Sequence, residues 1–465
     1  MASDPIKHVV VLMLENHSFD QMLGCMQEVY SDLDGVDASN PKSNSGVKQA
    51  PVAKMIVDPD PKHEYADVIF QIDNQCGNFV ADYRKSFGSI DAAKLEQVMA
   101  YFPLDSLPVL HSLGRNFRIC DRWFSSMPGP TWPNRYFVHS GTANGHVDMP
   151  TGIFDPNIHW FDQVTVYNRL ADKGVSWKIY RDGPHHALTL VRLWKYISHF
   201  DDMKDFEQDA RDEQTFPQYC FIEPDYFWPG RNDQHPPTDL RTGEELIARV
   251  YNALRSNEKL WATTLLVLTY DEHGGFYDHV VPPKAIPADN RADKTGFLFD
   301  RYGVRVPTLL ISPWVSQGVD HTQCDHTSVL KYVSEKWGLG PLGARVANAN
   351  SIAIALSDKP LTSTPPLVGA ELPKLFAAQQ PTAAVETMDE HQQALVAFGE
   401  FLEKEMEREL AAQGRTPAPP PLILAAKAPA RRAETTYDRF LQLTASGQLD
   451  VDRIAARRSN TAVPK

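Results

Sequence analysis

Short apolar runs that end in polar residues are the clearest pattern along the chain. The first covers residues 8–14 and is followed by the polar residues 15–17. Its length and valine content favour a buried strand over a helix. Similar runs at 263–270 and 304–311 predict two more strands. Polar residues after a strand are either solvated or, at the carboxyl edge of an open α/β sheet, part of a ligand site.

Helical patterns lie between or after these strands. Residues 243–255 and 327–337 carry apolar side chains at helical spacing. Strands that alternate with helices predict an α/β fold, in which a mostly parallel central sheet is covered by helices on both faces. We therefore expect an α/β/α sandwich.

The composition changes at about Lys359, where proline and alanine become frequent. We divide the chain into a main domain, residues 1–360, and a Pro-rich, partly helical C-terminal extension, residues 361–465. Thr387 and Glu390 are spaced to cap a helix, and a second helix is expected at 435–443.

The first of these helices is predicted to be amphipathic. Its apolar face either seals the core or approaches lipid; the apolar positions are Leu395, Phe398, Leu402, Met406 and Leu410. The opposite face is predicted to be acidic and consists of Glu400, Glu403, Glu405, Glu407 and Glu409. Helices that lie in a membrane interface carry Lys or Arg on the polar face, so this pattern argues against a membrane anchor and favours packing against the core or a lid near the rim of the ligand site.

Composition and charge narrow the class of protein. The 465 residues carry a formal net charge of −13, which argues against a nucleic-acid partner. No segment is apolar and long enough for a transmembrane helix, and the N-terminus does not have the pattern of a secretory signal. We expect a cytoplasmic protein, or the mature form of an exported one. The five cysteines form no C-x-x-C pair and predict neither a zinc knuckle nor a disulfide framework.

The second predicted strand also ends in carboxylates. Asp271 and Glu272 follow it directly, and two adjacent carboxylates require a compensating charge when they are buried. Together with Glu15 and Asn16 they offer oxygen ligands, which suit a hard divalent cation such as Ca²⁺, Mg²⁺ or Mn²⁺. Twin glycines at 274–275 would let the backbone approach a ligand closely. The alternative is that each of these side chains is solvated at the surface.

A proline-framed turn at 128–135 contains the hydroxyl of Thr131. Such a turn can hold a hydroxyl for in-line attack, with its proton removed through metal coordination, or it is simply a well-ordered turn. Several histidines lie beside prolines or acids in other predicted turns: His63, His185, His186, His235 and His326.

Five motifs in order carry a resemblance to a known family. They are ENHSFD (15–20), PTWPNR (130–135), NDQHP (232–236), DEHGGFYDHV (271–280) and VRVPTLLISPW (304–314). The chain resembles the bacterial acid phosphatase and phospholipase C family, which includes the plant non-specific phospholipases C and belongs to the alkaline-phosphatase-like superfamily. The resemblance covers roughly residues 7–340 and implies an alkaline-phosphatase-like sandwich.

The resemblance also implies roles for individual residues. Glu15, Asn16, Asp271 and Glu272 match metal-binding positions, and Thr131 matches a nucleophile that also contacts the metal. The histidines expected near the phosphate are His235 and His185 or His186, and His63 resembles part of a pocket motif. Asn134, in the motif that contains Thr131, is counted among the catalytic residues. The segment 181–190 looks closer to the acid-phosphatase branch than to the plant lipases.

These assignments predict a hydrolase with one divalent metal: Ca, Mg or Mn, with Zn or Fe as alternatives. The expected reaction is phospholipase C hydrolysis of glycerophospholipid head groups through a phospho-threonine intermediate, with His235 as general acid. The alternatives are a broad-specificity acid phosphatase and a non-catalytic binding module on the same fold. The expected partner is a phosphate ester, including phospholipid at a membrane surface; the oligomeric state is left open.

Overall fold

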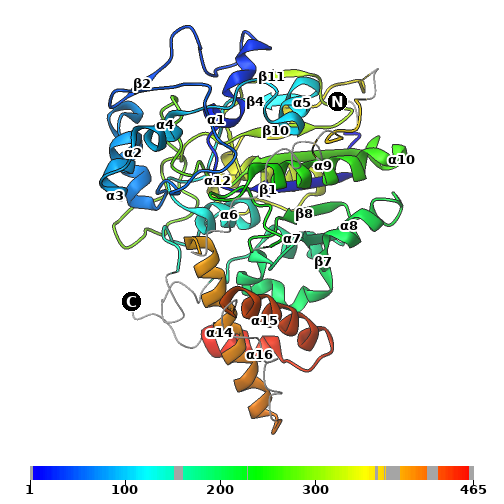
Figure 1. Cartoon of the computed structure of the whole chain (residues 1–465). Helices are drawn as coiled ribbons and strands as arrows, with labels where there is room; N and C mark the ends of the chain where they lie inside the picture. The colour runs from blue at the N-terminus through cyan, green and yellow to red at the C-terminus, as the bar shows by residue number, and fades with distance from the viewer. Residues whose placement is uncertain are drawn as a thin grey trace.

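A computed structural model describes residues 4–150, 161–227, 229–361, 365–370, 372, 388–415 and 428–459. Its centre is an eight-stranded sheet with the strand order β11-β4-β10-β9-β1-β8-β6-β7 (Figure 1). The strands, in this order, are Gly318–Asp320, Arg118–Cys120, Thr308–Ile311, Thr264–Tyr270, His8–Leu14, Tyr219–Glu223, Trp177–Arg181 and Phe200–Asp202. Two small sheets pair β12 (Cys324–Asp325) with β5 (Trp123–Phe124) and β2 (Ser43–Asn44) with β3 (Val47–Lys48).

The central sheet is mostly parallel, as predicted. β10 runs antiparallel to its neighbours β9 and β4, and the other neighbouring pairs are parallel. Every residue of β1 and β9 is buried, which is typical of a parallel sheet covered on both faces. The α/β/α prediction is confirmed.

Three predicted strands are found with small differences in their bounds. The strand at 8–14 is exact, and the strand predicted at 263–270 begins one residue later. The third is limited to 308–311. Pro307 precedes it and has no N–H to donate to a neighbouring strand, which explains the late start.

Helices pack around this sheet (Figure 1). The α-helices of the main domain are α1 (Phe19–Leu23), α2 (Tyr65–Cys76), α3 (Phe79–Phe87), α4 (Ala92–Met99), α5 (Pro108–Asn116), α6 (Thr131–Ser140), α7 (Val166–Asp172), α8 (Met203–Asp209), α9 (Leu240–Ser256), α10 (Glu258–Trp261), α11 (Thr327–Trp337) and α12 (Ala344–Asn348). The 3₁₀ segments are η1 (Gly24–Glu28), η3 (His186–Thr189), η4 (Val191–His199) and η5 (Ile352–Ala355). The bounds predicted for α11 are exact. α9 begins three residues before its prediction because Asp239 caps it, accepting from the N–H of Arg241.

The C-terminal extension contains α14 (Glu390–Ala412), α15 (Ala428–Ala445) and α16 (Val451–Ser459). Asp389, rather than Thr387, caps α14 in a capping box with Gln392; Thr387 itself lies outside the described residues. The predicted apolar face of α14 is buried, as Leu395, Phe398, Leu402, Met406 and Leu410 join the main hydrophobic core. Phe440 of α15 packs edge-on against Trp194 of η4. The apolar face therefore seals the core.

The predicted acidic face of α14 is corrected in part. Glu403, Glu405 and Glu409 are buried rather than solvated. Glu403 and Glu409 pair with arginines of α15 and α16, and Glu405 pairs with Arg408 on its own helix. The missing information was the tertiary packing of α15 and α16, whose arginines compensate the glutamates.

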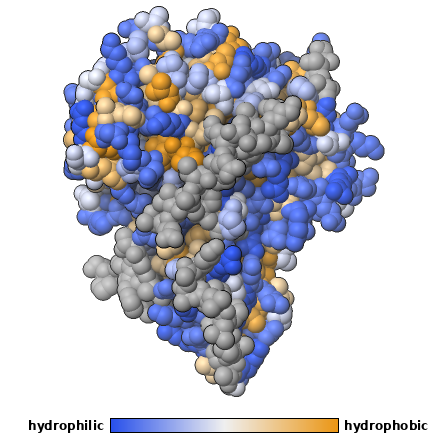
Figure 2. All heavy atoms as spheres, in the orientation of Figure 1, coloured by the Kyte–Doolittle hydropathy of each residue, from blue (hydrophilic) through white to orange (hydrophobic). Residues whose placement is uncertain are grey.

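The described helices include none with the length and apolarity needed to cross a membrane. On the face shown in Figure 2, hydrophilic side chains predominate and apolar ones are scattered among them.

Candidate active site

Two neighbouring parallel strands bring the predicted metal ligands to one edge of the sheet. Leu14, the last residue of β1, is in register with Tyr270, the last residue of β9, so Glu15 and Asp271 follow at the same level. The carboxylate oxygen Oδ1 of Asp271 accepts from the N–H of Asn16 at 3.3 Å and from the N–H of Glu272 at 2.7 Å. The two strand ends are thereby joined by hydrogen bonds.

Backbone conformation makes this junction tight. Asn16 has a φ of 59°, in the left-handed region. Gly274 lies so close to it that a Cβ on Gly274 would stand 2.2 Å from the carbonyl oxygen of Asn16. The glycine was predicted to let the backbone approach a ligand. In the structure, the close approach at Gly274 is to the loop that carries Asn16.

Arg135 is a buried cation between the carboxylates that the sequence reasoning did not assign. Its Nη2 lies 3.1 Å from Oε1 of Glu15, and its Nε lies 3.0 Å from Oδ2 of Asp271. Nη2 also donates to the carbonyls of Met13 and Leu14. This arginine supplies part of the compensating charge that the clustered carboxylates require.

Thr131 is the first residue of α6, the helix that also carries Arg135, and it is fully buried. The turn before it is held by Asn134, whose Oδ1 accepts from the N–H of Met127 at 3.0 Å. The Nδ2 of Asn134 donates to the carbonyls of Met127, Gly129 and Pro130 at 3.2, 2.9 and 3.2 Å. Both the oxygen and the nitrogen of the Asn134 side chain are thus used within the turn, which favours a role in holding the turn; its catalytic role stays a prediction.

The residues predicted to hold a cation fit that group. Buried polar atoms without a hydrogen-bond partner include both carboxylate oxygens of Glu15, both amide atoms of Asn16, Oγ1 of Thr131 and Oε1 of Glu272. Leaving such atoms unpaired in the interior is costly. They are oxygen donors of the type that a hard divalent cation binds. Asp271 differs, because both of its oxygens already have partners.

The electrostatics of the cluster agree with a missing positive charge. Burial raises the pKa of Glu15 to about 8, although Arg135 opposes this effect. Burial also raises the pKa of Asp271 well above its usual range. For Glu272, burial is outweighed by His63 and His273, which leave its pKa lowered. A bound cation would favour the ionised form of these carboxylates.

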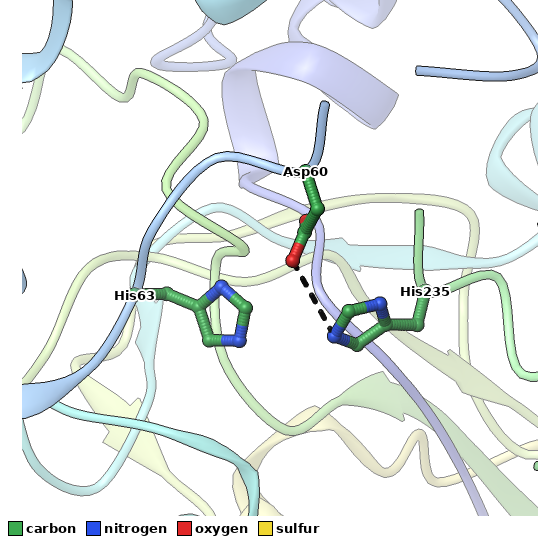
Figure 3. A group of neighbouring side chains, drawn as sticks. All are labelled: Asp60, His63 and His235. Carbon is green, nitrogen blue, oxygen red and sulfur yellow. Dashed lines mark ion pairs between the residues drawn. The ribbon is translucent and has the colours of Figure 1, made fainter. Parts of the chain in front are cut away.

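Asp60, His63 and His235 form a second group next to the carboxylates (Figure 3). The Nδ1 atom of each ring lies within hydrogen-bond distance of a backbone carbonyl of its own loop, so the Nε2 atoms face inward. Nε2 of His235 is 3.9 Å from Asp60, and Nε2 of His63 is 4.0 Å from Glu272. Burial lowers the pKa of His235 to about 4, whereas for His63 the nearby carboxylates outweigh burial and raise the pKa to about 10.

His185 and His186 are buried near Glu223. Nδ1 of His185 is 3.3 Å from Oε2 of Glu223. His186 forms a possible ligand group with His139 and Glu223, whose ligand atoms lie within 4.8 Å of one another. His185 is therefore placed against Glu223 at the end of β8, while the ring of His186 also borders the C-terminal extension through His391.

Two residues of the C-terminal extension enter the site, and sequence reasoning did not find them. Asp389 forms an ion pair with Arg231 at 2.5 Å and lies 3.8 Å from Nδ1 of His235. Nδ1 of His391 lies 2.6 Å from Oε1 of Glu15. The available signal was a short polar run, residues 389–393, before an apolar helical pattern, but such a run also describes an ordinary helix start.

Comparisons with known proteins were consistent with the motifs. The model of the family described as the phosphoesterase family matches residues 6–340. Non-specific phospholipase C3 of Arabidopsis thaliana is 37% identical over 345 residues, 68% of this chain and 65% of that protein. Hemolytic phospholipase C of Pseudomonas aeruginosa is 29% identical over 402 residues, 72% of this chain and 53% of that protein. The matches thus span just under two thirds, and about half, of these two relatives.

One solved structure aligns with this chain at low identity and a low TM-score. A protein in the alkaline phosphatase superfamily from Vibrio parahaemolyticus aligns with 8% identity and a TM-score of 0.35, over 75% of this chain and 72% of that one. The sequence matches, rather than this alignment, define the family.

Proposed function

The chain belongs to the phosphoesterase family, and from this premise we propose that it is a metal-dependent hydrolase of the phospholipase C type, acting on glycerophospholipid head groups. The observation that carries the proposal is a set of buried oxygen atoms without a hydrogen bond, on Glu15, Asn16 and Glu272 at one sheet edge and on Thr131 of α6. A phosphate ester needs positive charge at its binding site, and an oxygen-lined cation site supplies it in a chain of net charge −13.

The residues that would hold one divalent cation are Glu15, Asn16, Thr131, Asp271 and Glu272. When bound, such a cation lowers the pKa of a coordinated hydroxyl and neutralises charge on phosphoryl oxygens. We propose Ca²⁺, Mg²⁺ or Mn²⁺, with Zn²⁺ or iron as alternatives. The carboxylate of Asp271 pairs with Arg135 and accepts from the N–H groups of Asn16 and Glu272. These contacts hold it at the strand ends.

The proposed reaction uses Thr131 as nucleophile. Its hydroxyl would release its proton to solvent, Oγ1 attacks phosphorus, a new P–O bond forms, and the bond to the leaving oxygen breaks. The histidine pair His63 and His235, whose ring centroids lie 5.4 Å apart, is the proposed source of the proton for the leaving oxygen. Nearby carboxylates raise the pKa of His63 to about 10, whereas burial lowers that of His235 to about 4, so we assign this proton to His63 rather than to the predicted His235. A water then attacks the phospho-threonine and gives one proton to the pair, the bond between phosphorus and Oγ1 breaks, and Oγ1 takes up a proton from solvent, which restores the hydroxyl.

The test compares two substrates. Phosphatidylcholine vesicles should yield diacylglycerol and phosphocholine in equal amounts, at a higher kcat/KM than p-nitrophenyl phosphate yields phosphate. Elemental analysis of the same preparation identifies the bound metal. Preference for p-nitrophenyl phosphate, with no diacylglycerol formed, would replace the proposal by a broad-specificity acid phosphatase. Lack of hydrolysis of either substrate by the metal-loaded protein would leave a binding module.

A further inference from the structure

The N-terminal end of α14 is anchored at the candidate active site. Figure 1 shows this end of the helix beside α6, with the rest of the helix running away from the sheet. Asp389 pairs with the buried Arg231, and Glu390 pairs with Lys62, two residues after Asp60. The family match covers residues 6–340. These contacts therefore join a segment outside that match to the loops that carry the site.

His391 is the residue of this helix that faces the carboxylates. Its side chain is buried, and its Nδ1 lies 2.6 Å from Oε1 of Glu15. The contact lacks the alignment of a hydrogen bond, and both ring nitrogens are without a hydrogen-bond partner. The ring is held in place by Tyr226, at 4.4 Å between centroids, and by His186, at 5.8 Å.

An imidazole buried in this way needs a partner for its nitrogen. The carboxylate oxygens of Glu15 make no aligned hydrogen bond either, although Oε1 lies 3.1 Å from Nη2 of Arg135, so the nitrogen and this carboxylate lie side by side without a hydrogen bond between them. A second hydrogen-bond donor would satisfy the oxygens alone, whereas a cation satisfies the oxygens and an imidazole lone pair together. The packing of Tyr226 leaves the ring little freedom to turn away.

We propose that His391 is a nitrogen ligand, through Nδ1, of the divalent cation in this site. The inference rests on the cation site of the proposed function and adds a residue from the C-terminal extension to it. Imidazole suits Zn and Fe better than Ca or Mg, so His391 biases the site toward transition metals. The extension then has a chemical role in addition to its packing role.

The experiment uses the full chain, stripped of metal and reloaded with Mn²⁺. Pulsed EPR of the wild type should show ¹⁴N coupling from an imidazole bound to Mn²⁺. The variant His391→Phe keeps the ring volume but has no nitrogen, and His391→Asn keeps a polar group. Both should lose the ¹⁴N coupling and bind Mn²⁺ at least about tenfold more weakly, while Ca²⁺ affinity changes less.

Two controls separate this role from packing. Glu407→Gln lies on the exposed surface of the same helix and should retain both the coupling and the Mn²⁺ affinity. His186→Phe alters the ring that borders His391 and should retain the coupling. Thermal unfolding identifies a variant that fails to fold, in which case the other His391 variant carries the test.

The outcomes distinguish this inference from the proposed function. Bound Mn²⁺ without ¹⁴N coupling in the wild type, or coupling that persists in a folded His391 variant, overturns the role of His391 and leaves the cation site standing. A His391 variant that hydrolyses substrate faster than the wild type also overturns it, because α14 would then act as a plug. A wild type that binds no divalent ion by elemental analysis removes the cation site itself.

Discussion

Replacing Asn134 with aspartate tests whether the turn before α6 positions Thr131. The change is nearly isosteric, but aspartate cannot donate to the carbonyls of Met127, Gly129 and Pro130, to which the amide nitrogen of Asn134 donates. The amide has two hydrogens, so two buried hydrogen bonds are lost. At about 1–3 kcal/mol for each buried group left unpaired, the expected loss of unfolding free energy is about 2–6 kcal/mol.

The same change should slow the reaction although Asn134 does not face the carboxylates. A displacement of a reacting group by about 1 Å can cost on the order of 100-fold in rate. We expect kcat on a soluble phosphate ester to fall by about that factor, with a smaller change in KM, because the nucleophile rather than substrate binding is disturbed. Thermal unfolding and steady-state kinetics on one preparation measure both effects.

The matched control is Asn78→Asp. The amide of Asn78 donates to the carbonyl of Phe70 at a solvent-exposed position, where water can replace the bond. Its loss should therefore cost less than about 1 kcal/mol and leave kcat unchanged. If Asn134→Asp were as stable and as active as Asn78→Asp, the turn would not need this amide, and the positioning role would be refuted.

Three further predictions address the nucleophile, the cation and a charge network away from the site. Thr131→Ala should lower turnover by at least about 1,000-fold with little change in thermal stability, and more than a tenth of wild-type activity would rule out its role as nucleophile. Chelation should abolish hydrolysis until a divalent ion is restored, and Glu272→Gln should lower metal occupancy in elemental analysis; full activity of metal-free protein contradicts this. His279 pairs with Asp20 and Asp34, and these carboxylates outweigh burial and raise its pKa to about 10. Because its pKa is raised, protonated His279 stabilises the folded state at low pH. This stabilisation is at most about 5 kcal/mol; it is complete below about pH 6.5 and lost by about pH 10. The gap in Tm between wild type and His279→Gln should therefore narrow from pH 6 to pH 10, and a constant gap would show that the charge of His279 does not stabilise the fold.

The strands and the oxygen ligands could be predicted because both are local in the sequence. A valine-rich run gives a buried strand, and the polar residues at its end must then lie at a sheet edge. β1 and β9 are parallel neighbours in a register that pairs Leu14 with Tyr270, which brings Glu15 and Asp271 to the same level. The sequence does not show this register, so the meeting of the two residues depended on it.

The partners of these residues could not be predicted because they depend on the direction of helices. Arg135 was visible in its motif, but its position between Glu15 and Asp271 follows from how α6 crosses the strand ends. His391 lies more than 100 residues beyond the last motif ligand, and only the packing of α14 brings it to Glu15. Asn134 shows a limit of motif-based assignment, since membership of a motif does not distinguish a reacting side chain from one that holds the turn.

Charge balance links the acidic composition of the chain to its proposed chemistry. Glu15, Asp271 and Glu272 place three carboxyl groups in a buried cluster, against which Arg135 sets one permanent positive charge. Without a further cation, burial raises the pKa of Glu15 to about 8, so the site would hold protons in place of a metal. Such a site is nearly neutral and has little attraction for a phosphate ester. A divalent cation in place of those protons would leave the summed charge of the cluster near zero, but it would concentrate two positive charges at the point where phosphoryl oxygens bind. The proposed hydrolysis of a phosphate ester by a chain of net charge −13 requires such a concentrated positive charge.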